Sequence, residues 1–149
     1  MGLDMYLNAR RYVSPYSDTE LHTQLMEVTK DIRSIMSCRG VEFEAIYWRK
    51  ANAIHQWFVT NVQNGIDDCG QYPVSVEQLT ELKTTIETIL ADKEQAVTLL
   101  PPQSGFFFGS TDIGPYYFED LQYTLDKLTE ILNFVGDSWD WEFTYRSSW

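Results

Sequence analysis

The chain has 149 residues, the usual length of one domain, and its 44% hydrophobic and 22% charged residues are typical of a globular protein. We therefore expect residues 1–149 to form a single compact domain. A net charge of −11, from 11 Lys and Arg against 22 Asp and Glu, argues against direct binding of nucleic acid through its phosphates.

The first third of the chain predicts one strand and two helices. Alternating apolar and polar residues over 2–8 indicate a half-buried strand. Residues 17–20 match a capping box, which opens a first helix. A second helix is expected to begin between Val41 and Glu44 and to run to Asn61. The apolar stripe expected on the first helix consists of Leu21, Leu25, Val28, Ile32 and Ile35.

The rest of the chain predicts two more helices and a final strand. Ser75 and Gln78 repeat the capping-box pattern at the start of a third helix. Pro115 suits the first turn of a fourth helix, which should extend to about Phe134. Residues 139–146 alternate aromatic and polar side chains, a pattern typical of a strand.

Together these elements predict an α+β domain, with about four helices packed on a small antiparallel sheet. Neither terminal strand has a partner nearby in the sequence, so we expect the two to pair with each other. The segment Phe106–Phe108 lies between glycines and reads as a short buried strand that joins this sheet.

The stretch YWRKANAIHQWF, residues 47–58, is the strongest candidate for a binding site. On the expected helix, Trp48, Asn52 and His55 lie on one face. This face could stack on a flat ring and hydrogen-bond to it, while Arg49 and Lys50 neutralise an anionic group. The alternative is that the two cations pair with neighbouring glutamates and that the aromatic side chains fill the core.

Two other segments could contribute to such a site. Ser110 and Thr111 precede the expected fourth helix, and they could bind an anion at its N-terminus or act only as capping residues. Arg146, in the last strand, could face the same cleft as Arg49. The candidate ligand-binding residues are therefore Trp48, Arg49, Lys50, Asn52, His55, Ser110, Thr111 and Arg146.

Metal chemistry and covalent catalysis find less support. The two histidines, His22 and His55, have no second ligand at a metal-binding spacing, and we expect neither a metal nor a cofactor. Cys69 could assemble with His55 and either Asp67 or Asp68 as a nucleophile and base, but no spacing requires it. Catalytic residues are not identified, and we expect a protein that is not an enzyme.

Several unusual motifs give the chain a resemblance to known proteins. The motifs that carry this resemblance are MGLDMYL, YWRKANAIHQWF, DDCGQYPVS, LLPPQSGFFFGS, YYFEDL and WEFTYRSSW. Through them the chain resembles a family of small proteins encoded by bacteriophages and prophages. Some members carry the label phosphoglycerate kinase, which this chain does not support, because it has no GxxxxGK[ST] loop and is too short for two nucleotide-binding lobes. The resemblance implies a phage origin and action inside a bacterial host.

Three classes of function follow from the sequence. The first, which we favour, is a phage accessory protein, used for instance in counter-defence, that binds a small anionic aromatic ligand such as a nucleotide without turning it over. The second is an acidic protein that binds and inhibits a host protein, for example by mimicking nucleic acid. The third is a small hydrolase or transferase. Because the sequence shows neither a signal peptide nor 18 uninterrupted apolar residues, we expect no membrane association and a location in the host bacterial cytoplasm.

Overall fold

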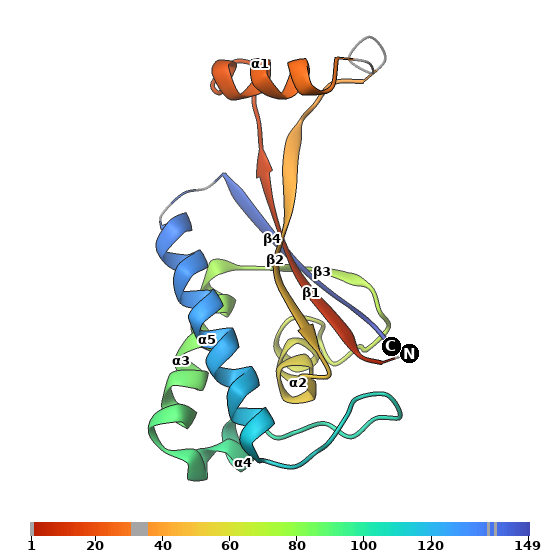
Figure 1. Ribbon diagram of the computed structural model, residues 1–149, viewed down its shortest axis with the longest axis vertical. Coiled ribbons are helices and arrows are strands. Elements are labelled where there is room, and N and C mark those ends of the chain that lie inside the picture. The colour runs from red at the N-terminus through yellow and green to blue at the C-terminus, as the bar shows by residue number, and fades with distance from the viewer. Residues whose placement is uncertain (1, 31–35, 137, 139) are drawn as a thin grey trace.

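The computed structural model describes residues 2–30, 36–136, 138 and 140–149 (Figure 1). Its elements, in chain order, are β1 (Asp4–Tyr12), α1 (Thr19–Val28), β2 (Gly40–Arg49), α2 (Asn52–Asn61), β3 (Gln71–Val74), α3 (Val76–Ala91), a 3-10 turn (Lys93–Gln95), α4 (Ala96–Leu99), α5 (Pro115–Val135) and β4 (Trp141–Ser148). The described residues thus form an α+β fold with five α-helices, one more than the sequence predicts, because the short α4 follows α3.

The four strands form one antiparallel sheet in the order β2-β1-β4-β3. The N-terminal strand β1 pairs along its length with the C-terminal strand β4, from Asp4 opposite Ser148 to Arg11 opposite Trp141. The prediction that the terminal strands pair with each other is therefore confirmed. This pairing fixes the two ends of the chain to one another at the centre of the sheet.

The prediction that Phe106–Phe108 is a strand of the sheet is wrong. These residues lie in a turn, where Phe106 is almost fully exposed and Phe108 is buried. Among the described residues, one backbone hydrogen bond links the turn to the N-terminal strand region, from the Leu3 amide to the Phe107 carbonyl. The flanking glycines permit a tight turn, and Gly109 adopts a left-handed φ of +88°.

The prediction of one helix from Val41–Glu44 to Asn61 is also wrong, because this stretch contains both β2 and α2. A β-bulge hides the strand in the sequence. Leu7 lies opposite Ile46 and Asn8 lies opposite Glu44, so Ala45 is an extra residue that interrupts the alternation of inward and outward side chains. Lys50 then adopts a left-handed φ of 61° and separates the strand from the helix.

The first predicted helix exists as α1, but not for the predicted reason. Its N-cap is Asp18, whose side chain makes no capping bond to the helix and accepts instead from the Ser14 amide and from Arg11. No residue of α1 is buried, and the helix lies across the ends of β1 and β2, away from the other helices (Figure 1). Of its predicted stripe, Ile32 and Ile35 lie outside the described residues.

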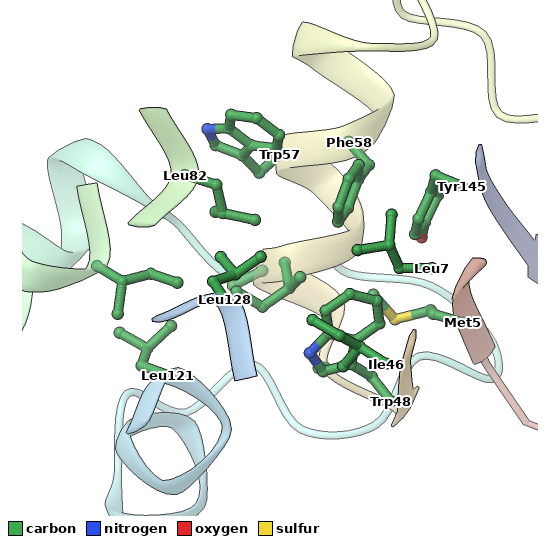
Figure 2. Packing of buried hydrophobic residues seen from close by; sticks show 14 of the residues in the cluster. Met5, Leu7, Ile46, Trp48, Trp57, Phe58, Leu82, Leu121, Leu128 and Tyr145 are labelled. Carbon is green, nitrogen blue, oxygen red and sulfur yellow. The ribbon is translucent and has the colours of Figure 1, made fainter. Parts of the chain in front are cut away.

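The core lies between one face of the sheet and helices α2, α3 and α5 (Figures 1 and 2). The third predicted helix is confirmed as α3, with the Ser75–Gln78 capping box formed in both directions. The fourth is confirmed as α5, with Pro115 in its first turn. The ring of Phe58 from α2 stacks on Tyr145 from β4 at 3.9 Å and joins the helical layer to the sheet (Figure 2). Among the described residues, no helix is long and apolar enough to cross a bilayer.

Candidate functional site

A hollow of about 620 Å³ opens where β2 passes into α2 and where α5 begins. This volume is typical of small-molecule sites. Three chain segments form its wall, namely residues 49–54, 109–115 and the first turns of α5. Of the residues predicted from the sequence, Arg49, Lys50, Asn52 and Ser110 line this hollow. The structure therefore brings together four of the eight candidate residues from segments about sixty positions apart.

The two cations of the hollow have a carboxylate nearby, since Asp4 lies opposite Arg49 on β1, but this carboxylate accepts a hydrogen bond from Tyr47 instead. Within the described residues, neither Arg49 nor Lys50 forms an ion pair, and Glu42 instead accepts a hydrogen bond from Asn8. Lys50 holds its left-handed φ without the freedom of glycine, and its aliphatic stem packs against Gly109. A non-glycine residue in this region costs of order 1 kcal/mol, and such strain is often found at functional sites.

Two helix N-termini also face the hollow. Ala51 and Gly114 are the N-caps of α2 and α5, and no described side chain forms a capping bond to either helix. Within the described chain, the amides of Ala53 and Tyr116 have no backbone acceptor. Free amides and the partial positive charge at a helix start favour an anion. Two such ends beside two unpaired cations make this part of the hollow suited to a phosphate or carboxylate.

Asn52 fixes the loop that forms the opposite wall. Its side-chain amide donates to the carbonyls of Phe108 and Ser110, at 3.0 and 2.8 Å, and its carbonyl oxygen accepts from the Gln103 amide. These three hydrogen bonds connect the loop of residues 103–110 to the start of α2. Asn52 is 5% exposed, so its amide is committed to the fold rather than free for a ligand. We infer that it positions the hollow and does not contact what the hollow holds.

The hollow also has an acidic and aromatic side, formed by the turn before α5 and by the first turns of α5. Asp112 and Asp120 line it, together with Tyr116, whose ring is 83% exposed. Asp112 is bound within its own turn, because it accepts from the Ser110 hydroxyl at 2.8 Å. Burial raises the pKa of Asp120 to about 6, and the neighbouring charge of Glu119 adds to the rise. Sequence analysis identified neither Tyr116 nor Asp120, although their i, i+4 spacing on a predicted helix could have shown that they share a face.

The raised pKa of Asp120 predicts how stability depends on pH. The folded protein holds this proton more tightly than the unfolded chain, whose Asp has an ordinary pKa near 3.8, so stability falls as pH rises from about 4 to 6. Asp120→Asn should remove this part of the decline. At pH 7 the variant should be more stable by about 1 kcal/mol or less, since solvent screens a partly exposed carboxylate. Urea denaturation from pH 4 to 7 measures both effects, and a variant with an unchanged pH profile would contradict them.

His55 lies in a separate, buried network. Its imidazole is 0% exposed, with Nδ1 at 2.7 Å from the Tyr145 hydroxyl and Nε2 at 3.0 Å from Asp67. The second oxygen of Asp67 accepts from the indole of Trp149. Burial, together with the charges of Asp67 and Cys69, raises the pKa of Tyr145 well above its ordinary value. Tyr145 is therefore a neutral phenol, and its hydroxyl and the Asp67 carboxylate are the two hydrogen-bond partners of the His55 ring.

Three other candidate residues are also not among those that line the hollow. Trp48 is 2% exposed, and its indole donates to Thr124 at 2.8 Å within the core (Figure 2). Thr111 is exposed beside the hollow but is not one of its lining residues. Arg146 lies on the face of the sheet that the helices leave open, with its guanidinium 4.2 Å above the ring of Tyr6. Trp48 and His55 diverge because one belongs to a strand and the other to a helix.

The arrangement of Cys69, His55 and Asp67 does not form a nucleophile and base. Cys69 is exposed, whereas His55 is enclosed and both of its ring nitrogens already have partners. A general base must have a nitrogen free to take a proton. Over the described ranges, the acidic, histidine and cysteine side chains form no group of three that could hold a metal ion.

Comparison of the chain with protein-family models, with curated proteins and with solved structures finds no match. The interpretation of the hollow therefore depends on its own residues and geometry.

Proposed function

We propose that the protein binds a small anionic ligand with an aromatic ring, such as a nucleotide, in the hollow between α2 and α5 and releases it unchanged. The observation that supports this proposal most directly is the meeting of Arg49 and Lys50, both without ion pairs in the described chain, with two uncapped helix N-termini. Arg49 and Lys50 are exposed and form no ion pair among the described residues, so both side chains are available to an anionic ligand. The exposed ring of Tyr116 provides a stacking surface beside them.

Binding without turnover is proposed because the hollow contains no activated nucleophile among its described residues. The hydroxyl of Ser110, which lines the hollow, is hydrogen-bonded to Asp112. Neither a histidine nor a cysteine is among the described residues that line the hollow. In a phage-encoded protein acting inside a bacterium, a binder of this type could sequester a signalling nucleotide of the host. That role is consistent with the resemblance noted above and forms part of the proposal.

A ligand panel tests this proposal. Purified protein is titrated with inorganic phosphate, with nucleosides and with nucleoside mono- and diphosphates, and the melting temperature is followed. Nucleotides should raise the melting temperature in proportion to the logarithm of their concentration, and phosphate should raise it less. Nucleosides should have little effect, because they lack the anion. Mass spectrometry of the recovered ligand should show it intact. Equal stabilisation by nucleosides and nucleotides, or none by either, would rule the proposal out.

A specific observation also favours a second function, the binding of a host protein. The apolar face of the sheet continues beyond the end of the helical layer and forms a groove of about 370 Å³. Trp141 lies at its centre, in ring contact with Phe43 and Phe134, and both phenylalanines are more than half exposed. Exposed aromatic clusters of this kind often mark protein interfaces. The test is capture of a host protein from bacterial lysate. If Phe134→Asp abolishes the capture and high salt leaves it intact, the result supports this function over nucleic-acid mimicry.

A further inference from the structure

Asp120 is a feature of the hollow that anion binding does not explain. Its carboxyl is removed from much of the solvent, which raises its pKa to about 6, and within the described residues no side chain or amide donates a hydrogen bond to it. Desolvating a carboxylate without a partner is unfavourable. A group of this kind in a cleft is a candidate for contact with a ligand.

We propose that Asp120 reads the base of the bound nucleotide and selects one that presents two adjacent N–H donors, as guanine does. This inference depends on the proposed function and names its ligand class. The carboxylate has two oxygens in one plane, which match two parallel N–H groups in the same way that they match an arginine side chain. Guanine carries such a pair at N1 and N2. Adenine and cytosine present an acceptor beside their single amino group, and uracil presents one N–H between two carbonyls.

The position of Asp120 on α5 suits this role. Tyr116 and Asp120 are separated by four residues on one helix, so the exposed ring and the carboxyl lie one turn apart on the same face, and both line the hollow. The phosphate-binding groups lie at the start of the same helix. A nucleotide with its phosphate near Gly114 and Lys50 could therefore place its base against Tyr116 with its edge toward Asp120.

Asp112 provides a matched control. It also lines the hollow and carries the same charge, but its carboxylate is already bonded to the hydroxyl of Ser110 and it lies in an exposed turn. Both Asp112→Asn and Asp120→Asn remove one negative charge near the anion. Only Asp120→Asn should change which base is preferred, because Asp120 lies one turn from Tyr116 on the same face of α5, whereas Asp112 lies in the turn before the helix.

The test compares guanosine and xanthosine monophosphates by calorimetry, since xanthine has a carbonyl where guanine has its N2 amino group. The unmodified protein should bind GMP at least tenfold more tightly than XMP, AMP or IMP. Asp120→Asn, whose amide can donate to the xanthine carbonyl, should bind GMP at least tenfold more weakly and XMP more tightly. Asp112→Asn should alter affinity for all of these nucleotides by a similar factor. Tyr116→Leu should weaken all of them without changing their order.

The outcomes separate this inference from the proposed function. Two results would contradict the proposal that Asp120 selects the base while leaving nucleotide binding supported. One is that all four nucleotides bind with similar affinity, and the other is that Asp120→Asn and Asp112→Asn change the base preference equally. If none of the nucleotides binds, the proposed function itself fails. Unfolding would not explain a weaker affinity of Asp120→Asn for GMP, because this variant is expected to be at least as stable as the unmodified protein at pH 7.

Discussion

The double variant Arg49→Ala, Lys50→Met is expected to bind nucleotide about 100-fold or more weakly than the unmodified protein, with an unchanged circular dichroism spectrum. Each hydrogen bond from a cationic side chain to a phosphate contributes about 1.5–3 kcal/mol, and the two together account for at least this loss. Methionine at position 50 keeps the aliphatic stem that packs against Gly109, so the loop wall should remain in place. Titration calorimetry with the nucleotide that stabilises the protein most measures the effect.

Arg146→Ala is the control for this experiment. It removes the same type of charge from a residue that sequence analysis also placed in the site, but its guanidinium lies over Tyr6 and does not line the hollow. Ionic screening limits the influence of a distant surface charge, and we expect a change in affinity of about threefold or less. If Arg146→Ala weakens binding as much as the double variant does, general electrostatic attraction rather than the hollow accounts for binding.

His55→Ala is expected to lower the free energy of unfolding by about 3–5 kcal/mol, which is a large share of the stability of a small domain. The substitution leaves a cavity at a fully buried position and deprives the hydroxyl of Tyr145 of its hydrogen-bond partner. It also frees Asp67, which ties α2 and the following turn to the C-terminal Trp149. Urea denaturation followed by circular dichroism measures the loss.

Two further variants isolate the cause of that loss. His22→Ala changes the other histidine, which lies on α1, where no residue is buried, and it should shift stability by about 0.5 kcal/mol or less. Tyr145→Phe keeps the ring stacked on Phe58 and removes only the hydroxyl, so it should cost about 1–2 kcal/mol. A His55→Ala protein as stable as His22→Ala would show that the buried network does not hold the C-terminal strand.

The elements that sequence analysis predicted well are those with strong local signals. α3 begins at a Ser–Gln capping box and α5 at a proline, and both then follow a helical apolar period. The terminal strands alternate clearly, and their lack of local partners was enough to pair them. Local chemistry determines these features, so one sequence is sufficient to predict them.

β2 shows why a local signal can also mislead. Apolar residues four positions apart, such as Phe43 and Tyr47, fit a helix, but four is also a multiple of the strand period of two. The bulge at Ala45 then removes the regular alternation that would have indicated a strand. What decides the outcome is pairing with β1, a contact between residues about forty positions apart, which the residues of β2 do not encode by themselves.

The candidate site could be predicted only in part for the same reason. Arg49, Lys50 and Ser110 were selected because cations are scarce in this chain and because Ser110 precedes a helix. Trp48 and His55 were added because a continuous helix would align them. The change from strand to helix at Lys50 sends Trp48 into the core against Thr124 and His55 toward Tyr145. Tyr116 and Asp120 join the hollow because α5 packs against α3 and β2, which places its first turns near the start of α2.

The proposed nucleotide binding requires an anion held between the two helix N-termini, and backbone amide NMR of the ¹⁵N-labelled protein tests this most directly. On titration with nucleotide, the amide signals of Ala53, Ile54, Tyr116 and Tyr117 should shift together and saturate with a single dissociation constant, while those of α1 and of residues near Arg146 stay unchanged. Shifts that do not saturate, or that are largest on the open face of the sheet, would contradict the account.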